Sequence, residues 1–336
     1  MSEPRREIVF RSVAGGLLRA GLTGGLRVVA GRSRLRPAFS IFTYHRVNDW
    51  GDAFQPAMPT AVFERQIRYV AAHYTVLTVE ELVDRMASGR VPRDAVAITF
   101  DDGYRDNLTH AAPILARYRV PATVFLATGF MGSKEVPWYH RLADALQRTS
   151  RSSVSSPSGE ELPLGDTAAR LAALRRLQGQ LKTLAEDRFQ ASLTGLLEGL
   201  GEPGSPAQRD LMLSWEDVLA LRGLGFRIGA HTVSHPILSR LTLERAREEI
   251  LGSRRAIEAA VGYPPRAFAY PNGGAADYTS DVVDLVRAAG FTCAVTTKFG
   301  MNTDSTSPWE LRRGQPWEED LPRFALKLAW YGLTLR

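Results

Sequence analysis

The chain has 336 residues, of which 44% are hydrophobic, and this is enough to bury one large core or two modest ones. Its one cysteine, Cys293, excludes an intramolecular disulfide bond and a zinc cluster built from cysteines. The net charge of +6 lies within residues 1–36, which hold eight Arg and two acidic residues. The rest of the chain has 34 basic and 34 acidic side chains and is therefore neutral. We do not expect this part of the chain to bind nucleic acid, because it has no excess of positive charge.

Residues 1–38 form a basic segment in which leucine and valine recur every three to five positions between Arg11, Arg19 and Arg27. This spacing predicts one apolar helical face, although several glycines weaken an isolated helix by up to about 1 kcal/mol each. Two interpretations stay open: the segment binds an anionic membrane surface, or it packs on the protein's own surface or serves as a partly ordered leader. The arginines argue against a secretory signal, and the absence of a run of about 18 apolar residues argues against a transmembrane helix. We expect a cytoplasmic protein, with peripheral attachment to the inner face of the cell membrane as an option.

From Phe39 onward, short apolar runs that are often bounded by Gly, Pro or charged residues alternate with helical patterns. Such alternation predicts an α/β fold in which helices cover a parallel sheet. About seven runs favour a barrel over an open sheet, although the sequence alone does not decide between them. The predicted strands are Phe39–Tyr44, Thr75–Thr78, Ala95–Phe100, Ala122–Ala127, Phe226–Ala230, Ala267–Tyr270 and Thr292–Thr297.

Helical patterns fill most of the sequence between these strands. Ser214 and Asp217 fit an N-terminal capping box, and Gly223 is typical of a helix stop. The predicted helices include Ala61–His73, Val79–Ser88, Leu108–Tyr118, Ser214–Arg222, Leu243–Val261 and Ser280–Ala289.

The stretch between the fourth and fifth predicted strands is unusually long, and we interpret residues 131–213 as a helical insertion. Within it, Ser150–Gly159 predicts a loop and Thr167–Leu200 predicts one long helix. The insertion is either a lid or cap on the substrate side, or structural padding. At the end of the chain, residues 317–336 predict an amphipathic helix that either joins the N-terminal segment on a membrane or docks on the main domain.

Two carboxylates, Asp101 and Asp102, directly follow the predicted strand Ala95–Phe100. At the end of a strand the chain can turn and direct both side chains into one cleft, and Gly103 permits that turn. Taken alone, Asp-Asp-Gly is more typical of an ordinary turn.

Two histidines, His231 and His235, follow another predicted strand, and their His-x-x-x-His spacing suits a single metal ion. Pro236 indicates that any helical turn there ends at once. One carboxylate and two imidazoles with open coordination positions favour Zn²⁺, with cobalt, manganese, nickel and iron as alternatives.

The string Thr-Phe-Asp-Asp-Gly-Tyr at 99–104, followed by His-Thr-Val-Ser-His-Pro at 231–236, resembles the polysaccharide deacetylase family, the NodB-homology carbohydrate esterases. The resemblance covers roughly residues 39–313, within a domain that we place at 39–316. It implies a distorted seven-stranded (β/α) barrel that hydrolyses N-acyl groups on amino sugars. By position it also implies that Asp102, His231 and His235 bind the metal and that Asp101 is the general base.

The family's third motif is altered in this chain. In Phe268–Gly273, Ala269 stands where the family commonly has Arg, and Asn272 stands where Tyr is usual. The backbone N–H of Asn272 still suits the stabilisation of an oxyanion. Arg313 is our first candidate to replace the missing arginine that orients the base, and Arg266 is the second; a surface salt bridge is the alternative for either.

The family's late histidine, its usual general acid, is also absent, because no His follows His235. His45, at the end of the first predicted strand, is our candidate to donate a proton to the leaving amine or to bind substrate. A structural histidine that is hydrogen-bonded to the backbone is the alternative. Further expected substrate contacts come from the motifs and from an aromatic residue at the start of the insertion: Tyr104, Tyr270, Pro271, Asn272 and Trp138.

Together these features predict a metal-dependent hydrolase that removes an acyl group, first of all acetyl, from an amino sugar in a polysaccharide or a lipid-linked glycan. A deformylase acting on a lipid-linked sugar is a close variant of this prediction. The altered third motif and the absent late histidine keep a non-catalytic carbohydrate-binding protein open, and an O-acetyl esterase is a third alternative.

Overall fold

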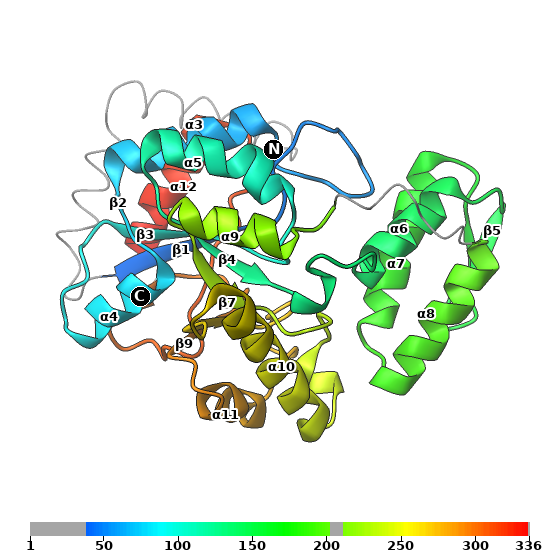
Figure 1. Cartoon of the computed structure of the whole chain (residues 1–336). Helices are drawn as coiled ribbons and strands as arrows, with labels where there is room; N and C mark the ends of the chain where they lie inside the picture. The colour runs from blue at the N-terminus through cyan, green and yellow to red at the C-terminus, as the bar shows by residue number, and fades with distance from the viewer. Residues whose placement is uncertain (1–37, 202–210, 335–336) are drawn as a thin grey trace.

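The computed structural model describes residues 38–201 and 211–334, with the side chains of the last helix described up to Leu328. Figure 1 shows a central sheet surrounded by helices, with a helical lobe beside it. The predicted basic segment at 1–38 falls almost entirely outside the described residues. None of the helices in the described ranges is both long and apolar enough to span a bilayer.

All seven predicted strands are present and run parallel, which confirms the α/β fold. They curl into a half-barrel in the order β1, β3, β4, β7, β8 and β9, with β2 paired to the start of β3. A short strand that was not predicted, β10 (Asn302–Thr303), pairs antiparallel with β1. The parallel strands are β1 (Ala38–Tyr44), β2 (Thr75–Val76), β3 (Ala95–Phe100), β4 (Thr123–Leu126), β7 (Arg227–Ala230), β8 (Ala267–Ala269) and β9 (Cys293–Val295).

A late segment, residues 311–314, joins the two ends of this curl. The backbone of Leu311 exchanges hydrogen bonds with the chain at β9, donating to Ala294 and accepting from Thr296. Gly314 does the same at β1, where it donates to Ile41 and accepts from Thr43. The segment therefore lies between β9 and β1, and Arg313 is held between the two ends of the sheet.

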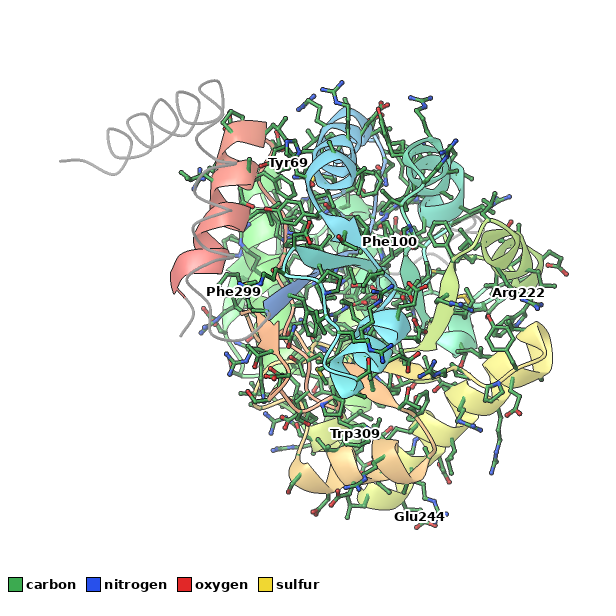
Figure 2. The ribbon with its side chains drawn as sticks, turned by 90° about the vertical axis from the view of Figure 1, so that its left-hand side faces the viewer. Tyr69, Phe100, Arg222, Glu244, Phe299 and Trp309 are labelled. Atoms are coloured by element: carbon green, nitrogen blue, oxygen red, sulfur yellow. The ribbon has the colours of Figure 1, made fainter. Side chains whose placement is uncertain are left out.

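Helices cover the sheet and bury their apolar faces against it (Figure 1). Thr78 with Glu81 forms a capping box, and so does the predicted pair of Ser214 and Asp217. In Figure 2, Phe100 lies in the main hydrophobic core and Tyr69 lies near the last helix. The covering helices are α3 (Thr60–His73), α4 (Val79–Ala87), α5 (Ala112–Tyr118) with a π-helical turn (Asn107–Ala111) before it, α9 (Trp215–Gly223), α10 (Leu243–Val261), α11 (Ser280–Ala288) and α12 (Leu321–Thr334).

The predicted C-terminal amphipathic helix is α12, and its described side chains dock on the main domain. Phe324, Ala325 and Leu328 are buried in the main core, and the ring of Phe324 packs 6.3 Å from that of Tyr69 on α3. This apolar face is therefore used by the fold itself.

The predicted insertion contains a helical lobe with its own hydrophobic cluster, to which Phe54 of the main domain also contributes (Figure 1). Two details of the prediction are wrong. The stretch at 150–159 holds a strand of a hairpin, and the predicted long helix is two helices. The lobe consists of α6 (Trp138–Arg148), β5 (Ser153–Ser155), β6 (Glu161–Pro163), α7 (Thr167–Leu181) and α8 (Glu186–Leu200).

Burial of leucines explains the break between α7 and α8. Ala185 has an extended backbone and caps α8, so the chain turns at 182–185. The turn lets both helices pack on α6 and place Leu177, Leu181, Leu193 and Leu197 in one cluster. A single continuous helix over residues 167–200 would leave part of that apolar surface in water.

Gly229 on β7 is a position where the sheet tolerates no side chain. A Cβ atom there would lie 2.4 Å from the ring of Phe125 and 3.0 Å from the carbonyl oxygen of Ala267. We expect Gly229→Ala to lower the free energy of unfolding, measured with urea, by about 1–3 kcal/mol because both neighbours are packed. Gly223→Ala is the matched control, since a Cβ there meets nothing within 4 Å. Equal stabilities of the two variants would contradict this account of the sheet.

Candidate active site and metal centre

The two sequence motifs meet at the carboxyl end of the sheet. Asp101 and Asp102 follow β3, and His231 follows β7. The chain turns sharply at both places, with positive φ angles of 73° at Asp102, 66° at Thr232 and 59° at His235. Such conformations cost of order 1–3 kcal/mol each for residues other than glycine and often occur at functional sites.

Asp102, His231 and His235 bring three potential metal-ligand atoms together. Nε2 of His231 lies 3.4 Å from Oδ1 of Asp102, and Nε2 of His235 lies 3.3 Å from the same oxygen. The three atoms lie within 4.8 Å of one another, and all three side chains are almost fully buried. Nδ1 of His231 is 2.7 Å from the carbonyl oxygen of Ala269 and must donate to it, which leaves Nε2 as an acceptor when the ring is neutral.

These atoms fit a divalent cation. Burial lowers the pKa of His235 to about 4, so this imidazole is neutral near pH 7. Oδ1 of Asp102 is buried and has no hydrogen-bond partner among the described residues. Acceptor atoms that face one another without a proton are costly to bury, and a cation between them removes that cost. Two imidazoles and one carboxylate suit zinc and other divalent metals; the identity of the metal stays a prediction.

A buried glutamate on α10 supports the loop that carries both histidines. One carboxylate oxygen of Glu249 accepts the backbone N–H groups of Val233 and Ser234, and the other accepts the Ser234 hydroxyl. Within the loop, the backbone N–H of His235 donates to the hydroxyl of Thr232. Glu249 was not singled out from the sequence, because an acid in an amphipathic helix is usually solvated.

Asp101 lies beside the three candidate metal ligands and forms a bidentate salt bridge with Arg313. The two guanidinium nitrogens lie 2.8 and 2.7 Å from the two carboxylate oxygens. Arg313 is 1% exposed, and its Nε also donates to the carbonyl oxygen of Thr296. Burial acts to raise the pKa of Asp101, but the charge and hydrogen bonds of Arg313 together with the charges of His231 and His45 outweigh it and hold the pKa below its usual value. Asp101 is therefore ionised at neutral pH and oriented to accept a proton.

The second arginine candidate lies elsewhere. Arg266 forms an exposed ion pair with Asp84 of α4. Of the two arginines, only Arg313 reaches Asp101.

A cavity of about 510 Å³ opens over the metal-ligand residues. Tyr104, His45, Asn272 and Trp138 line it, as the sequence predicted for residues near the substrate. Trp317, which was not predicted, also lines it and is 49% exposed.

Two of the predicted substrate contacts do not reach this cavity. Tyr270 is fully buried, its ring stacks on Tyr278 with centroids 4.2 Å apart, and its hydroxyl donates to the carbonyl oxygen of Trp309. Pro271 is buried and is not among the lining residues. The chain turns after β8 so that Asn272, with a φ of 58°, faces the cavity while Tyr270 packs in the core.

The insertion supplies a residue that contacts the metal-ligand carboxylate directly. The hydroxyl of Tyr139, on the first turn of α6, donates to Oδ2 of Asp102 at 2.9 Å. This bond leaves Oδ1 as the oxygen that faces the histidines. No role at the metal centre was predicted for Tyr139, because nothing in the sequence pattern connects the insertion with Asp102.

A second set of hydrogen bonds holds α6 against the main domain. Oε1 of Gln55 accepts from Arg46 and lies 2.6 Å from Nδ1 of His140, which must therefore donate. Nε2 of His140 then accepts the hydroxyl proton of Tyr104 at 2.7 Å. Burial lowers the pKa of His140 to about 3, so the ring is neutral, as this arrangement requires. No role was predicted for His140 from the sequence.

Comparison with known proteins agrees with this geometry. The model of the family described as polysaccharide deacetylase matches residues 88–294, more than half of the chain. The chain belongs to the polysaccharide deacetylase family. The predicted resemblance is thereby confirmed, and with it the assignment to hydrolases that act on carbon–nitrogen bonds.

Curated relatives in the polysaccharide deacetylase family match a shorter part of the chain. The poly-beta-1,6-N-acetyl-D-glucosamine N-deacetylase of Staphylococcus aureus is 36% identical over 81 residues, which are 24% of this chain and 27% of that protein. The enzyme of the same name from Staphylococcus epidermidis is 38% identical over 72 residues, 21% of this chain and 25% of that protein. The chain thus spans about a quarter of the length of these relatives.

Solved polysaccharide deacetylase structures share the fold. IcaB from Ammonifex degensii has a TM-score of 0.58 at 18% identity and covers 88% of this chain and 97% of its own. The Streptococcus pyogenes deacetylase PplD in complex with acetate has a TM-score of 0.56 at 17% identity and covers 83% of this chain and 92% of its own. At this identity the likeness establishes the fold, the distorted seven-stranded α/β barrel that the sequence predicted.

The two arginine candidates give a matched test of the buried ion pair. We expect Arg313→Gln to lower the free energy of unfolding by about 3–5 kcal/mol, because it leaves the charge of Asp101 buried without its partner. Arg266→Gln removes an exposed pair with Asp84 and should cost about 0–1 kcal/mol. Urea unfolding of the two variants measures both values. Similar losses in the two proteins would contradict the assignment of Arg313 as the residue that orients Asp101.

The hydroxyl of Tyr139 should strengthen metal binding. We expect Tyr139→Phe to weaken zinc affinity by about 10–100-fold, since hydrogen bonds to ligating groups fix their orientation. Competition with a chromophoric chelator measures the affinity. Tyr118→Phe is the control, because it removes a hydroxyl that donates to Glu64 instead. If both variants bind zinc as the unaltered protein does, Tyr139 does not position Asp102.

Proposed function

We propose that the protein is a metal-dependent N-deacetylase that hydrolyses the N-acetyl group of an amino sugar in a polysaccharide or a lipid-linked glycan. One observation carries the proposal: a buried set of metal-ligand atoms lies beside a second, arginine-oriented carboxylate at the base of an open cavity. A metal site and a separate base are the two parts that hydrolysis of an unreactive amide requires.

Different residues at the base of the cavity serve different steps of amide hydrolysis. Asp102, His231 and His235 would hold a divalent cation, which when bound polarises a carbonyl group and increases the acidity of water. Asp101 takes the proton of the water that attacks the acetyl carbon, and Arg313 keeps its carboxylate in place. The backbone N–H of Asn272, at the cavity wall, stabilises the developing oxyanion.

His45 donates the proton that the leaving amine needs. It lies on the cavity wall, half-buried, and close enough to Asp101 and Asp102 to lower the pKa of both carboxyl groups, against the opposing effect of their burial. A histidine in this position compensates for the absence of a late histidine in the chain.

Two features support a glycan as substrate. Trp138 and Trp317 both line the cavity, and aromatic side chains of this kind can pack on the apolar face of a sugar ring. The Staphylococcus relatives are named as N-deacetylases of poly-N-acetylglucosamine. An N-acetylglucosamine unit is therefore the first substrate to test.

The ion pair between Asp101 and Arg313 also favours catalysis over carbohydrate binding without turnover. A non-catalytic binding protein has no need for a buried, ionised carboxylate next to a metal site, and burying such a charge is costly unless it is paired. The altered third motif, which motivated that alternative, is compensated because Arg313 reaches the base from another segment.

Asp101→Asn tests the proposed chemistry. We expect acetate release from N-acetylglucosamine oligomers to fall by about 10²–10⁴-fold, because the amide cannot accept the proton of water, while zinc content stays the same. Asp281→Asn, on the exposed first turn of α11, is the control and should keep full activity. Unchanged turnover in Asp101→Asn would remove Asp101 as the base. Release from O-acetylated but not N-acetylated sugars would replace the deacetylase with an esterase.

A further inference from the structure

The two histidines of the candidate metal site are held in different ways. Nδ1 of His231 donates to the carbonyl oxygen of Ala269, and its backbone N–H donates to Leu126 of β4, so neighbouring strands fix both its ring and its backbone. Nδ1 of His235 is buried and has no hydrogen-bond partner within the described ranges. A metal-ligating histidine usually donates its other ring N–H to an acceptor that orients the ring. The position of His235 therefore depends on ring packing and on the backbone of the loop that carries it.

That loop, residues 232–235, has a strained backbone. The φ angles of Thr232 and His235 are 66° and 59°. A β-branched residue such as threonine rarely adopts a positive φ angle, and such a conformation persists only where the surrounding structure enforces it. The backbone of the loop therefore needs partners that hold it in this shape.

The loop is in close contact with an element on each side. The carbonyl oxygens of Thr232 and Val233 accept the backbone N–H groups of Thr128 and Gly129, in the 3-10 turn after β4. A Cβ atom at Gly129 would lie 2.9 Å from the carbonyl oxygen of Val233, and one at Gly252 of α10 would lie 2.9 Å from its side chain. The loop is thus held between this turn and α10.

Glu249 of α10, which lies beside β7 in Figure 1, provides three hydrogen bonds to the loop. One carboxylate oxygen accepts the backbone N–H groups of Val233 and Ser234 at 2.8 and 2.9 Å, and the other accepts the Ser234 hydroxyl at 2.7 Å. Glu249 is 1% exposed, and Arg245 donates to it at 3.0 Å, which balances its charge. The carbonyl groups of the loop are therefore bonded from one side and its N–H groups from the other.

We propose that Glu249 is a positioning residue for the metal site, because it sets the position of His235 by holding the loop in its strained conformation before a metal ion binds. His231 keeps its position without Glu249, since β7 and the Ala269 carbonyl hold it. This inference rests on the metal-dependent function proposed above and adds to it a residue outside the sequence motifs that determines metal affinity.

Hydrogen exchange of the metal-free protein tests whether Glu249 acts before metal binds. In Glu249→Ala, the backbone N–H groups of Val233 and Ser234 should exchange about tenfold or more faster, because each loses a hydrogen bond to a charged group. The N–H groups of β7 should exchange as in the unaltered protein, since they bond to the neighbouring strand. Unchanged exchange in the loop, or equally faster exchange in β7, would contradict the proposal.

Zinc affinity, measured by competition with a chromophoric chelator, tests the effect on the site. We expect Glu249→Ala to weaken zinc binding by about 10–100-fold, which is typical when a group that orients a metal ligand is removed. Glu249→Gln should weaken binding less, because its amide oxygen can still accept both N–H groups. Glu248→Ala is the matched control, because it removes an exposed acid that pairs with the same Arg245, and it should bind zinc as the unaltered protein does.

Two further variants separate positioning from general stability. Ile257→Ala removes a buried side chain two turns further along α10, so it should lower the free energy of unfolding while zinc affinity stays the same. Ser234→Ala removes one of the three bonds to Glu249 at an exposed residue, so it should fold and weaken zinc binding by about 2–10-fold. Ser239→Ala, whose hydroxyl donates to Ala276 instead, is its control.

Unchanged zinc affinity in Glu249→Ala and Ser234→Ala, or no zinc binding by the unaltered protein, would overturn the proposal. Equal weakening by Glu249→Ala and Glu249→Gln would overturn it in favour of a charge effect on the cation. Equal weakening by Ile257→Ala would overturn it in favour of general destabilisation. Acetate release reports separately on the proposed function, because a protein whose zinc affinity depends on Glu249 but that releases no acetate would refute only that function.

Discussion

Asp102 presents one buried oxygen to the Nε2 atoms of His231 and His235, and this contact among acceptor atoms constrains the rest of the site. The carbonyl of Ala269 fixes the orientation of one imidazole, and Glu249 holds the loop that carries the other. The hydroxyl of Tyr139 occupies the second oxygen of Asp102 from the lobe. The bond to Ala269 and the bond from Tyr139 direct lone pairs toward a common point, and a cation bound there offsets the cost of burying these atoms together.

Two parts of the chain that lie far from the motifs complete the site. The segment at 311–314 joins β9 to β1 and so brings Arg313 to Asp101. The helical lobe brings Tyr139 to Asp102 and lines part of a cavity beside His235. The barrel therefore supplies Asp101 and the three candidate metal ligands, whereas the late segment and the lobe provide the side chains that orient the two carboxylates.

Local patterns were sufficient to predict the seven parallel strands, most of the helices between them and the pair of histidines, because apolar strand runs and closely spaced ligands are visible within short windows. The choice of Asp102 as the third ligand came from the family resemblance. Contacts between distant segments were not predictable in this way. Arg313 was only one of two arginine candidates, Tyr139 and His140 had no assigned role at the metal centre, and Tyr270 was placed at the substrate although it packs in the core. The break between α7 and α8 was missed because it is set by leucine burial on α6, which the local helical pattern does not show.

The binding of metal by the full chain tests the central claim most directly. The account predicts that protein dialysed against metal-free buffer and then exposed to zinc retains roughly one equivalent per chain, and that His235→Ala loses it while remaining folded. Retention of the same amount of metal by His235→Ala, or no retention by the unaltered protein, would contradict the assignment of Asp102, His231 and His235 as a metal site.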